Sequence, residues 1–223
     1  MTDPLPPSQT PEDPRSPAQI LSISVGHCQP LLIREGPQGG TRKVVSGIRK
    51  VPISTQGSPQ PVFCGVTGLS GDEQADLTVH GGQDKAVYCY PAIHYAFWQA
   101  ALEASDARRS RLDTHGALGE NLTIVGLTEH TVYLGDLWEI GEVRLRVEQP
   151  REPCYKLNAV MGDRMASRKM FLQQACGWYL SVQIPGVLAA GQSITVLPGP
   201  RSLTIAKALS QRRPTEAAGA PPF

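Results

Sequence analysis

The stretch Gln149-Pro150-Arg151-Glu152-Pro153-Cys154-Tyr155-Lys156 follows the most regular strand pattern in the chain. Residues 142–148 alternate strictly between apolar and charged side chains, which is the period-two pattern of a half-buried strand. Pro150 ends this strand, because proline has no amide hydrogen to donate to a neighbouring strand. The pattern therefore predicts a strand that stops at a stiff corner and leaves a cysteine at the edge of a sheet.

Cys154 carries the chemistry of this corner. Pro153 fixes the backbone just before it, and residues 155–161 are predicted to form the first turns of a helix. A thiol there lies near the positive end of the helix dipole, with Arg151 and Lys156 on either side. Both effects favour the thiolate, the form that attacks electrophiles or binds soft metals. The alternative is a buried, inert cysteine, which leaves the two prolines and two cations unexplained.

Composition excludes several classes of protein. With 223 residues the chain is long enough for one main domain with a good core. The net charge of +1, with scattered lysine and arginine, argues against binding to nucleic acid or an anionic membrane. No apolar run reaches the length of a membrane span, and no signal peptide is recognisable. The 5 cysteines include no C-x-x-C pair, so a disulfide framework is not expected and a reducing, cytoplasmic setting fits best.

The remaining pattern predicts a mainly β fold with a few helices (α+β), of the size of a compact barrel or sandwich. Short strands are predicted at residues 20–25, 44–53, 59–66, 86–90, 122–125, 132–134, 137–140, 142–148, 178–184 and 192–197. The last two are predicted to pair with each other across the Pro185-Gly186 turn. Helices are predicted at residues 92–104, 164–176 and 202–212, the second of them capped by Gly177.

Two glycine-containing segments suggest anion binding. Ser46-Gly47-Ile48-Arg49-Lys50 interrupts a strand with a hydroxyl, a glycine and two cations. An edge strand with solvated charges explains this segment equally well. In the second segment, His80-Gly81-Gly82, paired glycines expose backbone amides that can form an anion-binding nest, with Lys85 nearby. A plain hairpin loop is the more common explanation of such a pair.

His94 and Trp98 share one stripe of the helix predicted at residues 92–104. Side chains four residues apart lie on the same face of a helix. The stripe is more typical of core packing than of chemistry. His94 is interpreted as a hydrogen-bonded core histidine at a pocket wall.

Together these motifs resemble the MOSC domain, named for the C-terminal part of molybdenum-cofactor sulfurases, and most closely its small bacterial YiiM-type branch. Each block is weak alone, but they occur in the family's order across nearly all of the predicted globular part. The blocks are Ser46-Gly47-Ile48-x-Lys50, Gly71-Asp72-Glu73-Gln74-Ala75-Asp76, Val79-His80-Gly81-Gly82-x-Asp84-Lys85-Ala86, Tyr90-Pro91-x-x-His94-Tyr95-x-x-Trp98, Gly119-Glu120-Asn121-Leu122, Val132-Tyr133-x-Gly135-Asp136 and Gln149-Pro150-Arg151-x-Pro153-Cys154-Tyr155-Lys156-Leu157-Asn158.

The resemblance implies a MOSC-type β-barrel at residues 20–198, between a proline-rich, disordered extension at 1–19 and a short C-terminal helix and tail at 199–223. Relatives in this branch often continue into three short helices, whereas this tail has room for one. The resemblance also implies a molybdenum cofactor (molybdenum held by a molybdopterin) whose metal is bound by Cys154. The resemblance implies that the molybdopterin part of the cofactor is bound by Ser46, Lys50, His80, Gly81, Gly82, Lys85, Asn121, Arg151 and Lys156.

The activity that the resemblance implies is reduction of small N-hydroxylated compounds, such as N-hydroxylaminopurine-type bases, hydroxylamines or amidoximes. Because the sequence contains no flavin, haem or iron–sulfur motif, an external electron donor, in the form of a flavoprotein reductase, is expected. The alternatives are a non-catalytic carrier of the cofactor or its sulfur, and a cysteine hydrolase with His80 or His94 as base. The oligomeric state stays open, with a dimer among the alternatives.

Overall fold

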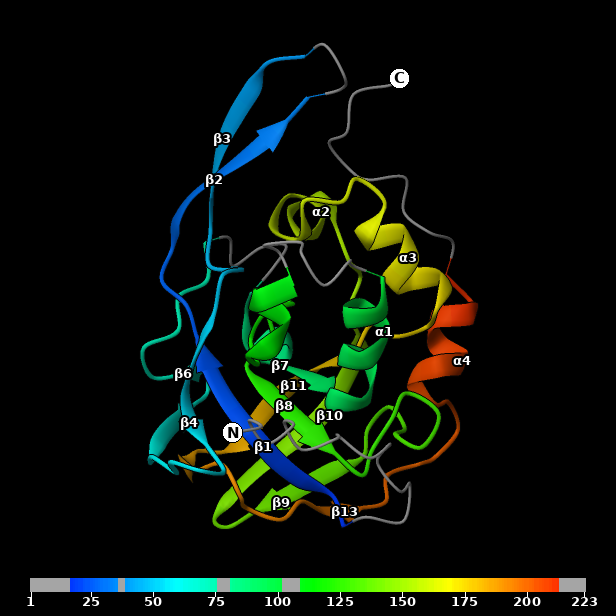
Figure 1. Ribbon diagram of the computed structural model, residues 1–223. Coiled ribbons are helices and arrows are strands. Elements are labelled where there is room, and N and C mark those ends of the chain that lie inside the picture. Colours follow the sequence, from blue (N-terminus) through cyan, green and yellow to red (C-terminus); the bar gives the residue numbers. More distant parts are fainter. Residues whose placement is uncertain (1–16, 36–38, 76–80, 102–108, 213–223) are drawn as a thin grey trace, which may run out of the picture.

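The computed structural model describes residues 17–35, 39–75, 81–101 and 109–212, and its main feature is a curled eight-stranded sheet (Figure 1). In spatial order the strands are β13 (Thr195–Leu197), β9 (Leu137–Ile140), β10 (Val143–Pro150), β11 (Trp178–Ile184), β7 (Val87–Pro91), β8 (Leu122–Val125), β1 (Gln19–Val25) and β4 (Val51–Thr55). Neighbouring strands are antiparallel except β7 and β8, which run parallel. Strands dominate and helices are few, so the predicted fold class is confirmed.

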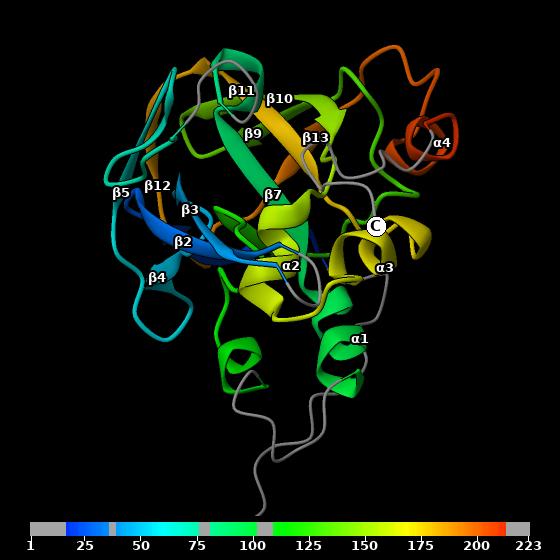
Figure 2. The same cartoon turned by 90° about the horizontal axis from the view of Figure 1, so that it is seen from above.

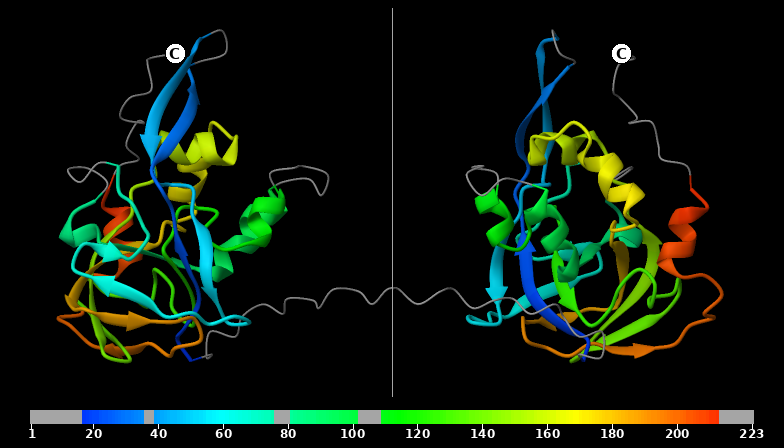
Figure 3. Two further views of the ribbon diagram at one scale, coloured as in Figure 1. Left: turned by 90° about the vertical axis from the view of Figure 1, so that its left-hand side faces the viewer. Right: turned by 45° about the vertical axis from the view of Figure 1, so that its right-hand side comes forward.

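Two smaller sheets complete the β structure. One has three strands in the order β12 (Gly186–Leu188), β5 (Val62–Gly65) and β6 (Gly68–Leu69). The other is a hairpin of β2 (Gln29–Arg34) and β3 (Thr41–Ser46), which projects from the body of the molecule (Figure 3).

The helices are short and three of them gather at one end of the curled sheet (Figure 2). These three are α1 (Tyr95–Ala100), α2 (Tyr155–Met161) and α3 (Ala166–Leu172). The fourth, α4 (Ile205–Ser210), packs against β10. Single turns of 3₁₀ helix occur at η1 (Gln83–Lys85) and η2 (Ala92–His94), and a longer one at η3 (Arg109–Asp113). Within the described residues, no helix is long and apolar enough to span a bilayer.

The core forms on the concave face of the main sheet, where the predicted alternation in β10 is confirmed. Val143, Leu145 and Val147 are almost fully buried, while the charged residues between them stay partly or fully exposed. Trp138 and Trp178 meet edge to face in this core, with ring centroids 5.8 Å apart. The apolar face of β10 therefore sets the orientation of the strand that leads to the cysteine corner.

Several predicted elements differ from the structure. Residues 132–134 form no strand, because Tyr133 makes only an isolated bridge to Thr204. The predicted pairing of residues 178–184 with 192–197 is wrong, since β11 lies between β10 and β7 while β13 pairs with β9. These differences have one physical cause: strand partners are chosen by long-range packing that local pattern does not contain.

The predicted helices are also shorter than expected. The helix expected at 164–176 ends at Leu172, and Gly177 lies beyond it in the left-handed region (φ 65°) rather than capping it. The helix expected at 92–104 is α1 preceded by η2, and residues 102–104 lie outside the described residues, as do residues 1–16 of the predicted extension.

Candidate functional site

A pocket of about 90 Å³ opens where segments from distant parts of the chain meet. Its walls come from the loop after β3, the loop after β6, the β10–α2 corner and the inward faces of β7 and β11. The predicted site residues that line it are Ser46, Lys50, Lys85, Asn121, Arg151, Cys154 and Lys156. Gly81 and Gly82 do not line it, and His80 lies outside the described residues.

Cys154 lies at the corner that the sequence predicted. It is the N-cap residue of α2, in extended conformation (φ −125°), and its carbonyl oxygen accepts from the amide of Leu157 at 2.9 Å. Its sulfur makes no capping hydrogen bond to the helix, and the side chain is half-buried. The backbone of Cys154 therefore begins the helix, and its thiol remains for the pocket.

Arg151 is buried below this cysteine, with only 5% of its surface exposed. Its guanidinium stacks on the ring of Tyr88, 4.6 Å from the centroid, and Nη1 donates to the Tyr88 hydroxyl at 3.1 Å. The same nitrogen contacts the sulfur of Met170 at 3.4 Å. Within the described residues no carboxylate pairs with Arg151. A buried guanidinium without a counter-charge is costly, so this site favours a bound anion.

Tyr88 and Tyr179 form an aromatic floor that sequence reasoning did not find. Their ring centroids lie 5.5 Å apart, and the Lys85 ammonium lies 5.9 Å from the Tyr179 centroid. Burial raises the pKa of the Tyr88 hydroxyl well above its usual value, so this phenol is neutral at physiological pH. The predicted strands at 86–90 and 178–184 contained both tyrosines, but no local signal indicated which face would meet the pocket.

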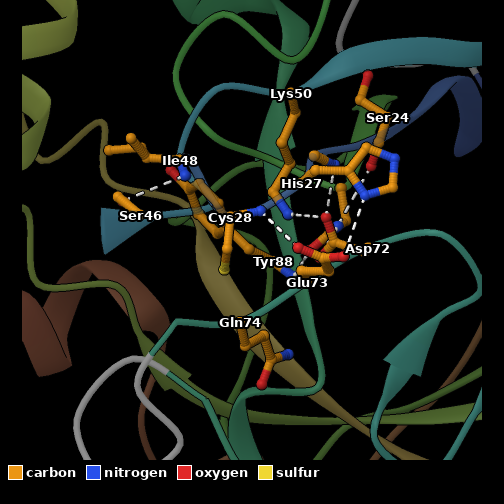
Figure 4. A network of polar contacts seen from close by, with 12 residues as sticks. Ser24, His27, Cys28, Ser46, Ile48, Lys50, Asp72, Glu73, Gln74 and Tyr88 are labelled. Atoms are coloured by element: carbon orange, nitrogen blue, oxygen red, sulfur yellow. Dashed lines mark hydrogen bonds and ion pairs between the residues drawn. The ribbon is translucent and has the colours of Figure 1, made fainter. Parts of the chain in front are cut away.

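The opposite wall is a hydrogen-bonded network around Asp72 (Figure 4). One carboxylate oxygen pairs with the Lys50 ammonium and accepts from the amide of Gly26 at 2.8 Å. The other accepts from the Asn121 side-chain amide at 2.9 Å. The Lys50 side chain is 8% exposed, and its burial lowers its pKa while the pairing with Asp72 opposes that shift. Lys50 is therefore a buried, paired cation and not a solvated charge of an edge strand.

Asn121 and Ser46 use their polar atoms mainly within the protein. The Asn121 side-chain amide also donates to the Ser24 carbonyl at 3.2 Å, and its oxygen accepts from the Tyr88 amide at 3.0 Å. The Ser46 hydroxyl accepts from the amide of Ile48 at 3.3 Å. Both residues line the pocket, and these bonds fix the positions of β1, β7 and the loop after β3.

The described part of the paired-glycine turn makes a hydrogen bond to a residue of the pocket wall. Gly82 has a positive φ of 91°, and its amide donates to the Gln74 side chain at 3.3 Å. Gln74 in turn lines the pocket. The glycine turn thus holds a pocket side chain in place, with one of its amides already used.

No histidine of the described residues lines the pocket with Cys154. His94 is half-buried and bonds to the buried Glu129 carboxylate at 2.8 Å, as expected for a hydrogen-bonded core histidine. His27 lies 3.2 Å from Glu73 and is exposed. No imidazole of the described residues therefore lines the pocket beside the Cys154 thiol, and His80, the other histidine predicted as a base, lies outside the described residues.

Comparison with known proteins identifies the family. The family model described as MOSC domain matches residues 76–195. The uncharacterized protein YflK of Bacillus subtilis is 36% identical over 178 residues, which cover 80% of this chain and 72% of the relative. Protein YiiM of Escherichia coli is 38% identical over 141 residues, 63% of this chain and 61% of the relative. The chain belongs to the MOSC domain family, which is associated with the molybdenum cofactor.

Two further similarities bear on the fold and on possible activity. The crystal structure of YiiM from Geobacillus stearothermophilus superposes with a TM-score of 0.65 at 30% identity, covering 86% of this chain and 82% of that one. A protein of Gibberella moniliformis named Reductase is 33% identical over 185 residues. Those residues are 82% of this chain but only 30% of the fungal protein.

Proposed function

We propose that this chain is a molybdenum-cofactor-dependent reductase of N-hydroxylated compounds, with Cys154 as the protein ligand of the metal. The observation that carries the proposal is the joint presence of the Cys154 thiol and the buried Arg151 in one pocket. A thiolate is a suitable ligand for a soft metal site, and an unpaired guanidinium suits a phosphate. The similarity to a fungal protein named Reductase supports the reaction class.

The residues of the pocket fit such a group. Arg151 and Lys156 line the pocket and have no carboxylate partner within the described residues, which supports a role for both in holding the phosphate of the cofactor. When bound, the cofactor supplies the two-electron chemistry that cleaves an N–O bond. Tyr88 and Tyr179 close the floor against water, and the Lys50–Asp72 pair fixes the opposite wall. Reduction to the amine consumes two electrons and two protons and releases water, and we propose a flavoprotein reductase as the electron donor.

Turnover by purified protein tests this function. Protein from cells grown with molybdate is mixed with reduced methyl viologen and benzamidoxime or N-hydroxyadenine, and product is measured by chromatography. The wild type is expected to form amidine or amine in proportion to its molybdenum content, and Cys154→Ala to form none. Cys28→Ala, a second half-buried cysteine, serves as the matched control and should retain activity.

Other outcomes point to other functions. Metal-independent activity that is lost when Cys154 is alkylated would contradict the proposal in favour of thiol chemistry. Cofactor bound at full occupancy without any reduction of either substrate would contradict it in favour of the carrier.

A further inference from the structure

The β2–β3 hairpin, called the arm below, has two faces of different character. Cross-strand pairs place Leu31 opposite Val44 and Ile33 opposite Arg42 on one face. This inner face packs on α2 through Leu31, Ile33 and Val160, which form a separate small apolar cluster. Arg42 adds a contact to the Tyr155 ring, 5.7 Å from its centroid. A lone two-stranded hairpin is marginal in water, so α2 is what holds the arm in place.

The outer face of the arm is exposed and apolar at its centre. The register places Pro30 opposite Val45 and Leu32 opposite Lys43 on this face. Leu32 is 57% exposed and Val45 is 58% exposed, among the highest values for large apolar side chains in the described residues. Apolar side chains grouped on one face of a projecting element are typical of a protein–protein contact.

The charged residues within the two strands of the arm are all cations. The strands β2 and β3 contain Arg34, Arg42 and Lys43 and no carboxylate. Arg42 pairs with Glu35 at 3.1 Å, next to the strand end. Arg34 and Lys43 are exposed, and neither has an ion-pair partner within the described residues. An apolar centre flanked by unpaired cations is complementary to an acidic protein surface.

The arm also adjoins the candidate site. Ser46 ends β3 and lines the pocket, and α2, on which the arm packs, begins directly after Cys154. Figure 1 shows the arm and α2 at the same end of the molecule. The outer face reaches the base of the arm at Val45, one residue before Ser46, so a protein bound to this face would contact the end of the arm that borders the pocket.

We propose that the outer face of the arm docks an acidic electron-transfer protein that reduces the site. This rests on the proposed function, because only a reductase needs such a partner. Two electrons are needed, and they come either from one fully reduced flavin or from two successive one-electron transfers by reduced iron–sulfur proteins. Together with two protons from water they convert the N–OH group to N–H and water. In the fungal relative named Reductase, the similar region is 30% of the chain, so further segments are linked to it there.

Charge reversal on the arm tests the docking surface. The probes are two acidic proteins, a bacterial flavodoxin and a [2Fe–2S] ferredoxin, with affinity measured by calorimetry on metal-free and on loaded protein. For at least one probe, we expect the affinity of Lys43→Glu to be about tenfold lower than that of the wild type, and the affinity of the double variant Arg34→Glu/Lys43→Glu to be lower still. The affinity of the wild type should fall as the salt concentration rises. Lys207→Glu on α4 makes the same charge change at an exposed site away from the arm and should leave affinity unchanged.

Turnover measured with two different reductants distinguishes a failure of docking from a failure of the proposed reductase function. Reduction driven by methyl viologen needs no docking and should be equal in all variants, whereas reduction driven by the acidic protein should fall in the arm variants and in Leu32→Ser. If methyl viologen drives no turnover in the wild type, the proposed function fails. The docking proposal is then tested only by the affinities of the arm variants for the two probe proteins. The docking proposal is overturned if neither probe binds or if arm variants bind as the wild type does. It is equally overturned if a DNA oligonucleotide binds as tightly, or if Leu32→Ser abolishes self-association seen by light scattering.

Discussion

The cysteines of this chain differ in the surroundings of their sulfur atoms. Burial raises the pKa of Cys64 to about 12, and it raises the pKa of Cys89 and Cys176 far above the usual value. Burial and nearby carboxylates also raise the pKa of Cys28. These thiols carry little thiolate at neutral pH and are poor nucleophiles. Cys154 is the half-buried cysteine at the head of a helix, beside two cations.

Alkylation should therefore be selective. With limiting iodoacetamide at pH 7, we expect Cys154 to be modified first, as measured by peptide mass spectrometry. The share of the label found on Cys28 should increase as the pH rises towards 9, because the thiolate fraction of Cys28 grows as the pH approaches its raised pKa. Modification of Cys28 ahead of Cys154 at pH 7 would contradict this account of the site.

Asp72 is the other residue on which the pocket depends, because it holds the charge of Lys50. Asp72→Asn should lower the free energy of unfolding by roughly 3 kcal/mol, since it leaves a buried ammonium without its counter-charge. The loss should be smaller near pH 9 than near pH 6. Without Asp72 the folded-state pKa of Lys50 falls further below that of the unfolded chain, so the unfolded state binds more protons and stability rises with pH.

Urea unfolding at both pH values measures this effect. The matched variant adds Lys50→Met, which removes the unpaired charge and should recover most of the stability. An equal loss in the single and double variants would show that the other hydrogen bonds of Asp72, not its ion pair, hold the wall.

At the scale of elements, the return from α3 to β11 depends on Gly177. Its φ of 65° suits glycine, and an added Cβ would overlap the carbonyl oxygen of Cys89 on β7. Gly177→Ala should cost about 3 kcal/mol or more of unfolding free energy, because both strain and overlap oppose it. Gly191→Ala is the control: φ is 89° but no atom lies within 4 Å of the added Cβ, so about 1 kcal/mol of strain is expected. Equal losses in thermal unfolding would show that overlap at Gly177 is unimportant.

Local pattern predicted the elements whose partners lie nearby or whose faces are one-sided. The alternation at 142–148 gave β10 and its buried face, and Pro150 and Pro153 gave the corner at Cys154. Local pattern did not predict the parallel pairing of β7 with β8. Both strands are buried, so packing with distant segments, and not local sequence, decides which strand each one pairs with. Arg151 was interpreted as a cation flanking the cysteine. Its stacking on Tyr88, 63 residues earlier, arises only when β11 brings β10 and β7 together.

At the scale of the whole molecule, the site is assembled from segments spread over most of the described chain. Asp72 joins Gly26 at the end of β1, the loop at Lys50 and Asn121, while the corner after β10 contributes Arg151 and Cys154. The sequence motifs contain most of these residues. They did not predict which side chains face the pocket and which only hold those side chains in position. The net charge of +1 likewise gave no sign that the two strands of one projecting arm carry cations and no carboxylate.

Metal content shows whether Cys154 holds a molybdenum cofactor. Wild type, Cys154→Ala and Cys28→Ala are purified from one host grown with molybdate, and molybdenum and pterin are measured per chain. We expect near-stoichiometric molybdenum in the wild type and in Cys28→Ala, and loss of molybdenum in Cys154→Ala. Equal molybdenum in Cys154→Ala, or no metal and no pterin in the wild type when a control molybdoenzyme loads in the same host, would contradict it.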